Sequence, residues 1–404
     1  MFRQITLIFL LLITCKLTGQ VNLVPNPSFE TYDTCPNILE KIKFAVPWFQ
    51  PNYPQGQYSS STDYFNSCTS NWTCSVPNNL AGYQYARTGQ AYVGYDLFEY
   101  PTDNSPREYA EVQLDSTLIA GNKYCVSFYV SLSAGGGFCT GTSAVGVYFS
   151  SDTCQYVSNT WGILPYTPQL INPQSNIITD TVGWQLVKWI YVAQGGERFI
   201  TIGNFWDGSY NSLCSVPVCS GDGSYFYMDD VAIIPLPEIN SGNDRTMIVG
   251  DTIQMSGSVS ELWSGMQFEW LPHSGLSSPY NLNTTASPSV TTTYTLTVSC
   301  PTCDVVCLND VMDSVTIFVE PISPPQTFSF HIPSLLYTDQ VFFIDSLPTE
   351  TRVKIYDMRG RIVFSSDDYG NNFYPVGLGG ANYVYEVTLP DERVFKGKLC
   401  VIKR

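Results

Sequence analysis

"NLVPNPSFETYDTCP", residues 22–36, is the stretch on which the assignment of the fold depends. It begins as a short strand-like run, turns at Asn26-Pro27, and continues through Phe29 and Glu30 to a second turn that contains Cys35. Asn and Pro favour turns, whereas the apolar residues beside them suit a strand. The stretch therefore predicts a first strand that bends sharply and carries one carboxylate, Glu30, whose partner must come from elsewhere in the chain.

Short strand-like runs continue along the chain. They are rich in Val, Ile, Tyr and Phe and are bounded by Gly, Asn, Pro and Ser, as in KYCVSFYVSLS (123–133), AVGVYFSS (144–151), WQLVKWIYVA (184–193), RFITIGNF (198–205) and YFYMDDVAII (225–234). No stretch keeps an apolar period of 3.6 residues between helix caps. The sequence therefore predicts an all-β protein with almost no helix.

The first twenty residues have the pattern of a secretory signal peptide. Arg3 precedes an unbroken apolar run at 7–13, and small and polar residues follow. The run is too short for a permanent membrane helix, so we expect residues 1–19 to be removed near Gly19-Gln20. No later segment has the apolar length of a membrane span. The chain is predicted to be exported.

Charge and cysteine content limit the partners and the compartment. Without Arg3 and Lys16 the chain has 17 basic and 35 acidic residues, and 17 − 35 gives a net charge of −18. This balance argues against nucleic acid, whose phosphates need clustered Lys and Arg, and suits divalent cations. Twelve cysteines remain in an exported chain, so disulfides are expected.

Three cysteines crowd one later segment, CPTCDVVC (300–307). A zinc site would need a fourth ligand nearby. In an oxidising compartment we expect a disulfide plus one thiol here instead. A short bridge between Cys214 and Cys219 is also predicted, because four intervening residues can close a tight loop when the Cα atoms come within about 7 Å.

Two proline-bounded breaks divide the chain. IIPLPEINSGND ends a first block near residue 238, and VEPISPPQ ends a second near residue 321. They predict three units, 20–238, 239–321 and 322–404. The first is long enough for a substantial core, and the others have the size of small sandwiches.

The first unit resembles a known fold at both ends. NLVPNPSFE and YFYMDDVAII resemble the first and last strands of galactose-binding-like jelly rolls, the fold of many carbohydrate-binding modules. The order of motifs over residues 21–235 also resembles N-terminal domains of exported bacterial surface proteins. This resemblance implies a jelly-roll β-sandwich and a disulfide between Cys35 and Cys68.

The resemblance also implies a structural calcium held by Glu30 and the pair Asp229-Asp230. Carboxylates on adjacent strands repel unless a cation or hydrogen bonds compensate, and calcium accepts carboxylate and carbonyl oxygens. Because side chains alternate along a strand, we expect only one of the two aspartates to point into the site. In the alternative interpretation, Glu30 accepts backbone hydrogen bonds at a sheet edge.

Aromatic residues make up 14% of the chain and are candidates for stacking against sugar rings. Exposed Trp and Tyr offer the flat π surface that suits the apolar face of a pyranose. Core packing is the alternative for each of them. The candidates lie in or beside expected loops: Trp48, Tyr92, Tyr95, Trp161 and Trp206.

The two later units resemble parts of bacterial surface proteins. FEWLP, with Trp270, and TTTYTLTV resemble strands of the Ig-like or PKD-like modules of adhesins, which implies a small sandwich that acts as a spacer, with Trp270 in its core. KIYDMRGRIVF, with a turn from Asp357 to Gly360, and the final strands resemble C-terminal sorting domains of the type IX secretion system, of the gliding-motility-associated type. The resemblance implies a cleavable export address. The TPNGDG start of one subtype is absent.

The histidines restrict catalysis in the first unit. The chain has only His273 and His331, both in the later units. Hydrolysis through a histidine base and histidine-ligated catalytic metals are therefore excluded for residues 20–238. A carboxylate pair of glycosidase type is still available from Glu99, Glu108 and Glu111.

We therefore expect an exported, non-catalytic protein, secreted or held on the outer-membrane surface of a Gram-negative bacterium, that binds carbohydrate or acts as an adhesin. Its expected partners are the type IX secretion machinery and an extracellular polysaccharide or cell-surface glycan, and not nucleic acid. The alternatives are a polysaccharide-active hydrolase and a purely structural envelope or matrix protein.

Overall fold

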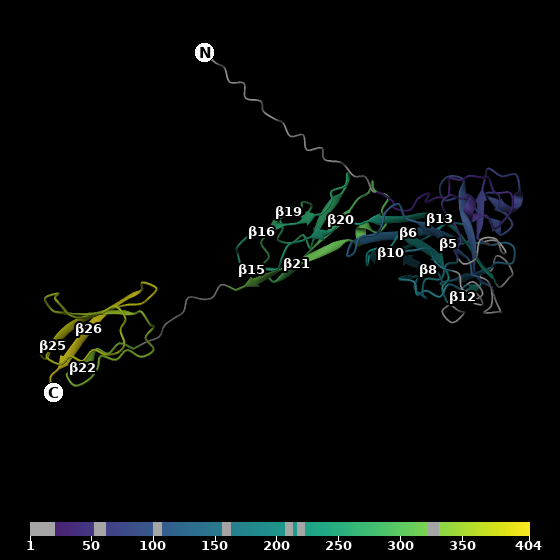
Figure 1. Ribbon diagram of the computed structural model, residues 1–404. Coiled ribbons are helices and arrows are strands. Elements are labelled where there is room, and N and C mark those ends of the chain that lie inside the picture. The colour runs from purple at the N-terminus through teal and green to yellow at the C-terminus, as the bar shows by residue number, and fades with distance from the viewer. Residues whose placement is uncertain are drawn as a thin grey trace, which may run out of the picture. The chain divides into compact units, whose positions relative to one another are not determined.

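The computed structural model describes residues 21–51, 62–99, 107–155, 163–206, 213–215, 223–321 and 331–404. The chain divides into two compact units, residues 1–321 and 322–404. The described residues form β-strands and a few single turns of 3-10 helix (Figure 1). The all-β prediction is confirmed. None of the helices found in these residues is long and apolar enough to cross a membrane.

The N-terminal part is a sandwich of two antiparallel sheets. The five-stranded sheet has the order β1 (Asp63–Asn66), β4 (Ala91–Glu99), β13 (Gly223–Pro235), β6 (Lys123–Leu132), β10 (Gln185–Val192). The four-stranded sheet has the order β5 (Tyr109–Gln113), β11 (Phe199–Gly203), β8 (Gly146–Ser150), β9 (Leu170–Ile171). Neighbours such as β4 and β13 are far apart in sequence, so the sheets assemble only when distant segments meet.

The core lies between the two sheets. In β4, every second side chain from Ala91 to Leu97 is buried in it, as expected for a strand with one face turned inward. Val147 and Phe149 of β8 and Ile200 of β11 belong to the same cluster. Each fully buried aliphatic or aromatic side chain contributes about 1.5–3 kcal/mol relative to exposure. The core holds both sheets in fixed register.

The outer face of the five-stranded sheet carries a second apolar cluster. It consists of side chains from β1, β4 and β13 covered by residues of the 74–81 segment: Phe65, Cys74, Ala81, Tyr92, Tyr225 and Tyr227. Tyr92 and Tyr227 meet edge to face with ring centroids 5.0 Å apart. This half of the face is therefore core and not a solvent-exposed surface.

The first stretch turns at Asn26-Pro27, as the sequence predicts, but it does not form the strand expected around that turn. Residues 24–29 form bends and turns, and Asn26 and Phe29 have positive φ values of 48° and 60°. Two backbone hydrogen bonds still join this stretch to β13: the Leu23 amide donates to the Ile233 carbonyl and the Val231 amide donates to the Pro27 carbonyl, each at 2.9 Å. The double turn at Asn26-Pro27 interrupts pairing, and Phe29 is fully buried beneath it.

Residues 239–321 form a second, smaller sandwich. One sheet has the order β15 (Arg245–Ile248), β21 (Met312–Glu320), β20 (Thr292–Ser299), β18 (Gln267–Leu271), and the pairs β16 (Ile253–Ser256) with β19 (Asn283–Ala286) and β14 (Ile239–Asn240) with β17 (Ser258–Val259) complete it. Trp270 is fully buried, in agreement with its predicted role in the core, and its Nε1 donates to the Asn281 carbonyl at 2.9 Å.

The two sandwiches share a packed junction. An apolar cluster contains Cys125 and Leu236 from the first and Trp263 and Val311 from the second. A disulfide joins Cys125 to Cys307, with their Cα atoms 5.5 Å apart. The boundary that we placed near residue 238 therefore falls inside one compact unit, residues 1–321.

The CPTCDVVC segment forms two disulfides instead of one disulfide and a thiol. Cys300 is joined to Cys303, as the spacing allows. The expected thiol is wrong, because Cys307 is bonded to Cys125, a residue that is distant in sequence. A partner contributed by another sandwich leaves no signal in the local pattern.

In the C-terminal unit the described residues form one five-stranded sheet, in the order β22 (Leu335–Tyr337), β26 (Val394–Ile402), β25 (Ala381–Thr388), β23 (Arg352–Asp357), β24 (Ile362–Ser366). Phe342 and Tyr369, from connecting segments, pack on its core face with Val353 and Leu399. The predicted turn is confirmed, since the Gly360 amide donates to the Asp357 carbonyl at 2.9 Å.

Candidate functional site

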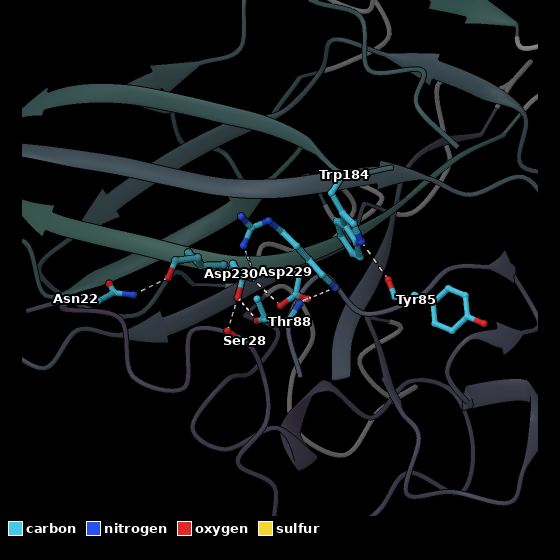
Figure 2. A network of polar contacts seen from close by, with 9 residues as sticks. Asn22, Ser28, Tyr85, Thr88, Trp184, Asp229 and Asp230 are labelled. Carbon is cyan, nitrogen blue, oxygen red and sulfur yellow. Dashed lines mark hydrogen bonds and ion pairs between the residues drawn. The ribbon is translucent and has the colours of Figure 1, made fainter. Parts of the chain in front are cut away.

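The segment Arg87–Ala91, which leads into β4, contacts both the first stretch of the chain and β13, the last strand of the first sandwich. Figure 2 shows Ser28 and Thr88 beside Asp230, with Asp229 next to it. In β13 the pairing with β6 shifts register between Asp229 and Ala232, and Asp230 has a φ of 51°. A bulge of this kind re-aims side chains. Contrary to the alternation argument, both aspartates therefore reach the Arg87–Thr88 segment.

Asp229 is fully buried and is held by backbone amides. Its Oδ2 accepts from the amides of Arg87 at 2.8 Å and Thr88 at 3.3 Å. Burial, and then the neighbouring charge of Asp230, raise the pKa of Asp229 from 3.8 to about 8, although the amides oppose this. Of these two adjacent carboxyl groups, Asp229 is therefore the one that tends to be protonated near neutral pH.

Arg87 provides the positive charge nearest to this pair. Its guanidinium forms an ion pair with Asp230 and lies 3.4 Å from the centroid of the Tyr129 ring. Burial alone would lower the pKa of Arg87, but the hydrogen bond to Asp230 outweighs it and the pKa is raised. Asp230 also accepts from the hydroxyls of Ser28 and Thr88, each at 2.5 Å. Sequence reasoning missed Arg87, because a single arginine in a loop forms no recognisable pattern.

Glu30 binds the same segment a few residues further on. Its Oε1 accepts from the amides of Gln90 at 2.7 Å and Ala91 at 2.8 Å. Gly89, with a φ of 62°, passes so close that a Cβ there would lie 2.3 Å from the carboxyl carbon of Glu30. Glu30 therefore joins the first stretch to the beginning of β4 through backbone hydrogen bonds. This is the role that the first subsection gives as the alternative to calcium binding.

The calcium site stays a prediction. The structure brings Glu30, Asp229 and Asp230 to one segment, but protein donors occupy all three carboxylates. Within the described ranges, no group of three or more His, Cys, Asp or Glu side chains is arranged to hold a metal ion. Arg87 supplies the charge that a cation would otherwise supply to Asp230. As described, the donor set does not fit a calcium ion.

Raising the pH should destabilise this part of the molecule. The folded-state pKa of Asp229, about 8, lies above the unfolded value of 3.8, so its contribution to stability is fully present below about pH 4 and is lost as the pH rises through 8. Asp63, raised to about 7 mainly by burial, acts with the same sign. We expect the melting temperature in chelator to fall from about pH 5 to about pH 9, and Asp229→Asn to weaken this dependence.

The matched control for this experiment is Asp63→Asn, which should remove its own share of the pH dependence, a share that lies between about pH 4 and pH 7. A wild-type melting temperature that does not change with pH would contradict the role of both groups. Calcium added in place of chelator tests the metal: a bound ion would raise the melting temperature, and Glu30→Gln would remove that rise. Identical curves with and without chelator would rule the calcium site out.

Three of the aromatic candidates are wrong as stacking residues because they are buried. Trp48 is 1% exposed, and Tyr92 and Tyr95 are 0% exposed. Trp48 packs on Phe29 with ring centroids 4.9 Å apart, and Tyr92 belongs to the covered outer-face cluster. The segments that cover them come from elsewhere in the chain, so local sequence could not show this burial.

The other two candidates for stacking on sugar rings are Trp206 and Trp161. Trp206 is half-buried, and its ring meets Phe205 at a centroid distance of 6.5 Å. Trp161 lies outside the described residues. Neither is established as a ligand contact.

A set of exposed aromatic side chains lies elsewhere, and we call Tyr83, Tyr85 and Trp184 the aromatic platform. Tyr83 and Tyr85 are 57% and 63% exposed, and their rings stand perpendicular with centroids 5.6 Å apart. Trp184 is half-buried, and its Nε1 donates to the Tyr85 carbonyl at 3.1 Å, as Figure 2 shows. The platform borders Arg87 along the chain. The alternation in GYQYAR (82–87) is the signal that could have found it.

The platform residues are held firmly from below. Gln84, between the two tyrosines, is buried, and its carbonyl accepts from the Tyr92 hydroxyl at 2.9 Å. The ring of Trp184 meets Tyr92 edge to face at 5.8 Å. Buried partners thus fix the backbone that presents the exposed rings.

The predicted cysteine pairs were Cys35 with Cys68 and Cys214 with Cys219. The structure joins Cys35 to Cys68, with Cα atoms 6.0 Å apart. Cys214 lies in β12 (Leu213–Ser215), which pairs with β7 (Thr140–Thr142), while Cys219 lies outside the described residues. Cys214 does not take part in a disulfide, so the predicted bridge to Cys219 is wrong.

The acids considered for a glycosidase pair are buried hydrogen-bond acceptors where they are described. Glu111 accepts from the Thr201 hydroxyl at 2.7 Å, and burial raises its pKa. Glu108 accepts from the Asp96 amide at 2.7 Å. The side chain of Glu99 lies outside the described residues. Both described acids serve the fold.

Comparisons with known proteins identify no family. No family model matches the chain, and no curated protein is significantly similar to it. The chain is similar to the solved structure of TmCBM61 in complex with β-1,4-galactotriose, at 13% identity over 53% of this chain and 99% of that chain, with a TM-score of 0.27.

Two further solved structures are similar to a comparable degree. One is the K1 cleaved adhesin domain of Lys-gingipain from Porphyromonas gingivalis W83, at 16% identity over 51% of this chain and 94% of that chain, with a TM-score of 0.27. The other is a CBM4 structure, at 14% identity over 52% and 99%, with a TM-score of 0.24. At such TM-scores these similarities carry no argument about function.

Proposed function

We propose that this chain is an exported, non-catalytic protein that binds carbohydrate through the aromatic platform. The observation that carries the proposal is the exposure of Tyr83 and Tyr85 on a backbone fixed by buried contacts. Exposed aromatic rings offer the flat apolar surface that the hydrogen-bearing face of a sugar ring contacts. Because the backbone beneath them is held in place, little conformational freedom is lost on binding.

The polar groups near the platform suit a hydroxylated and uncharged ligand. Arg87 follows Tyr85 by two residues, but its charge is committed to Asp230. The net charge of −18 after signal removal disfavours polyanions such as nucleic acid or acidic glycans. Neutral polysaccharide is therefore the proposed ligand class.

The proposed location is outside the cell, either in the medium or on the outer-membrane surface. Disulfides such as Cys35–Cys68 and Cys125–Cys307 are typical of oxidising compartments. The assignment of residues 322–404 as a type IX sorting domain rests on the sequence resemblance. In this proposal the second sandwich links the binding sandwich to that address.

A glycan-array screen of the full mature chain, with a check of every hit for product release, tests the proposal. Binding without turnover supports it. Binding with turnover would favour the hydrolase alternative, and no binding to any glycan would favour a purely structural role.

For any glycan found, Tyr83→Ala/Tyr85→Ala should weaken binding about 30-fold, because two stacked rings together contribute about 2 kcal/mol. Titration calorimetry of the full mature chain measures the change. Tyr280→Ala is the matched control, since this tyrosine is 64% exposed but lies in the second sandwich. Undiminished affinity in the double variant would show that the platform is not the binding surface.

A further inference from the structure

A hollow lies beside the four-stranded sheet of the first sandwich. It has a volume of about 500 Å³, which is within the usual range of about 300–1,000 Å³ for small-molecule sites. One wall is the loop Ser151–Gln155, which follows β8, and the other is the turn Gln194–Glu197, which connects β10 of one sheet to β11 of the other. Its floor is the edge of β8. We call it the β8 groove.

The wall formed by the turn Gln194–Glu197 is preorganised by one buried carboxylate. Glu197 is 6% exposed and accepts from the amides of Gln194 at 2.6 Å and Gly195 at 2.8 Å and from the Tyr191 hydroxyl at 2.8 Å. Although burial raises the pKa of Glu197, these hydrogen bonds outweigh it and the pKa is lowered. The side chain of Gln194 lies exposed on this fixed turn.

The opposite wall combines an aromatic pair with polar side chains. Tyr166 stacks on Tyr148 with centroids 4.8 Å apart and rings inclined by 16°. The Tyr166 hydroxyl accepts from the Gln155 amide at 3.1 Å, which ties the loop to the stacked pair. Asp152 and Gln155 are exposed at the mouth of the groove.

The floor of the groove is closed to peptide strands. The Gln169 side chain accepts from the Phe149 amide at 2.8 Å and donates to the Phe149 carbonyl at 2.9 Å, so it occupies the backbone groups that an added strand would need. The Ser150 Oγ is buried and has no hydrogen-bond partner among the described residues. A small ligand suits this floor better than a protein segment.

The charge of the lining selects the class of small ligand. Asp152 and Glu197 are acidic, and none of the described residues that line the groove is a Lys or Arg. Anionic ligands are therefore repelled. The side-chain amides of Gln155 and Gln194 and an oxygen of the Asp152 carboxylate can bind hydroxyl groups. An aromatic surface beside such groups is the arrangement that a sugar ring needs.

We infer that the β8 groove is a second carbohydrate-binding site, for one or two rings of a neutral saccharide. The inference shares only the ligand class with the proposed function, because it uses different residues on a different sheet. Two sites on one rigid sandwich bind a polysaccharide more tightly than either alone, since the second contact is made at a high effective concentration.

The test uses the full mature chain labelled with ¹⁵N-glycine, in which the amides of Gly195 and Gly196 report on the groove. Neutral β-1,4-linked trisaccharides of glucose, galactose and xylose are the probes. At least one should shift both signals saturably, and Gln155→Ala/Gln194→Ala should weaken that binding about tenfold or more. These side chains are exposed, so the variant should fold normally, and an unchanged melting temperature checks this.

Tyr83→Ala/Tyr85→Ala separates the two proposals. It should leave the glycine shifts unchanged even where it abolishes binding to the platform, so that failure at one site does not imply failure at the other. A ligand concentration of about 20 mM would reveal even a very weak dissociation constant. If none of the three trisaccharides shifts the two signals at that concentration, the inference is overturned. Equal shifts with trigalacturonate would overturn the selection of neutral ligands.

Discussion

Replacing both Cys125 and Cys307 by alanine is expected to lower the free energy of unfolding of residues 21–321 by about 5 kcal/mol. The disulfide closes a loop with a sequence separation of 182, and in the chain-entropy model a loop of that length restricts the unfolded state by about this amount. It also joins the two sandwiches across their shared apolar cluster. We therefore expect the single unfolding transition to separate into two.

Denaturant unfolding of the oxidised protein, followed by tryptophan fluorescence and circular dichroism, measures both effects. Cys300→Ala/Cys303→Ala is the matched control, because that bridge spans a separation of only 3 and restricts the unfolded chain far less. If the Cys125/Cys307 variant unfolds at the wild-type midpoint in one transition, the bond does not couple the sandwiches.

Deleting residues 322–404 is expected to abolish export across the outer membrane. In a host with a type IX system the truncated protein should accumulate in the periplasm, because the proposed address is lost while residues 1–321, a compact unit by themselves, are intact. Cell fractionation and protease accessibility of whole cells measure the distribution. Surface protein should fall to background.

The reciprocal experiment fuses residues 322–404 to a foreign soluble protein, which should then reach the surface in the same host. A melting curve of the truncated protein is the control that excludes misfolding as the cause of retention. Normal surface display of the truncated chain would show that the C-terminal unit is not the export address.

The strands of the first sandwich could be predicted where the pattern is local. The runs at 123–133, 184–193, 198–205 and 225–234 coincide with β6, β10, β11 and β13. Alternating apolar residues and flanking turn residues are sufficient for this. The turn at Asn26-Pro27 was also predicted from its residues. The bond from Cys125 to Cys307 could not be predicted, because it depends on a contact between distant segments that no local pattern encodes.

The candidate site was predicted in part. Glu30, Asp229 and Asp230 do converge on one segment, as the resemblance implied. Arg87, which neutralises Asp230, was not foreseen. Core packing was the alternative for Tyr92, but the sequence could not decide between the two roles, because an aromatic residue of a strand looks the same in sequence whether a loop covers it or not.

The bond between Cys125 and Cys307 has a further consequence if the molecule holds a surface under flow. Tension between the platform at Tyr83–Tyr85 and the C-terminal unit would run from residue 85 to Cys125, cross the sulfur bridge, and continue from Cys307 to residue 321. The backbone from 126 to 306 would bear no load. β10, β11, β13, the part of β6 that follows Cys125 and both walls of the β8 groove lie within this shielded loop, so the pull would not act along the backbone of the second site.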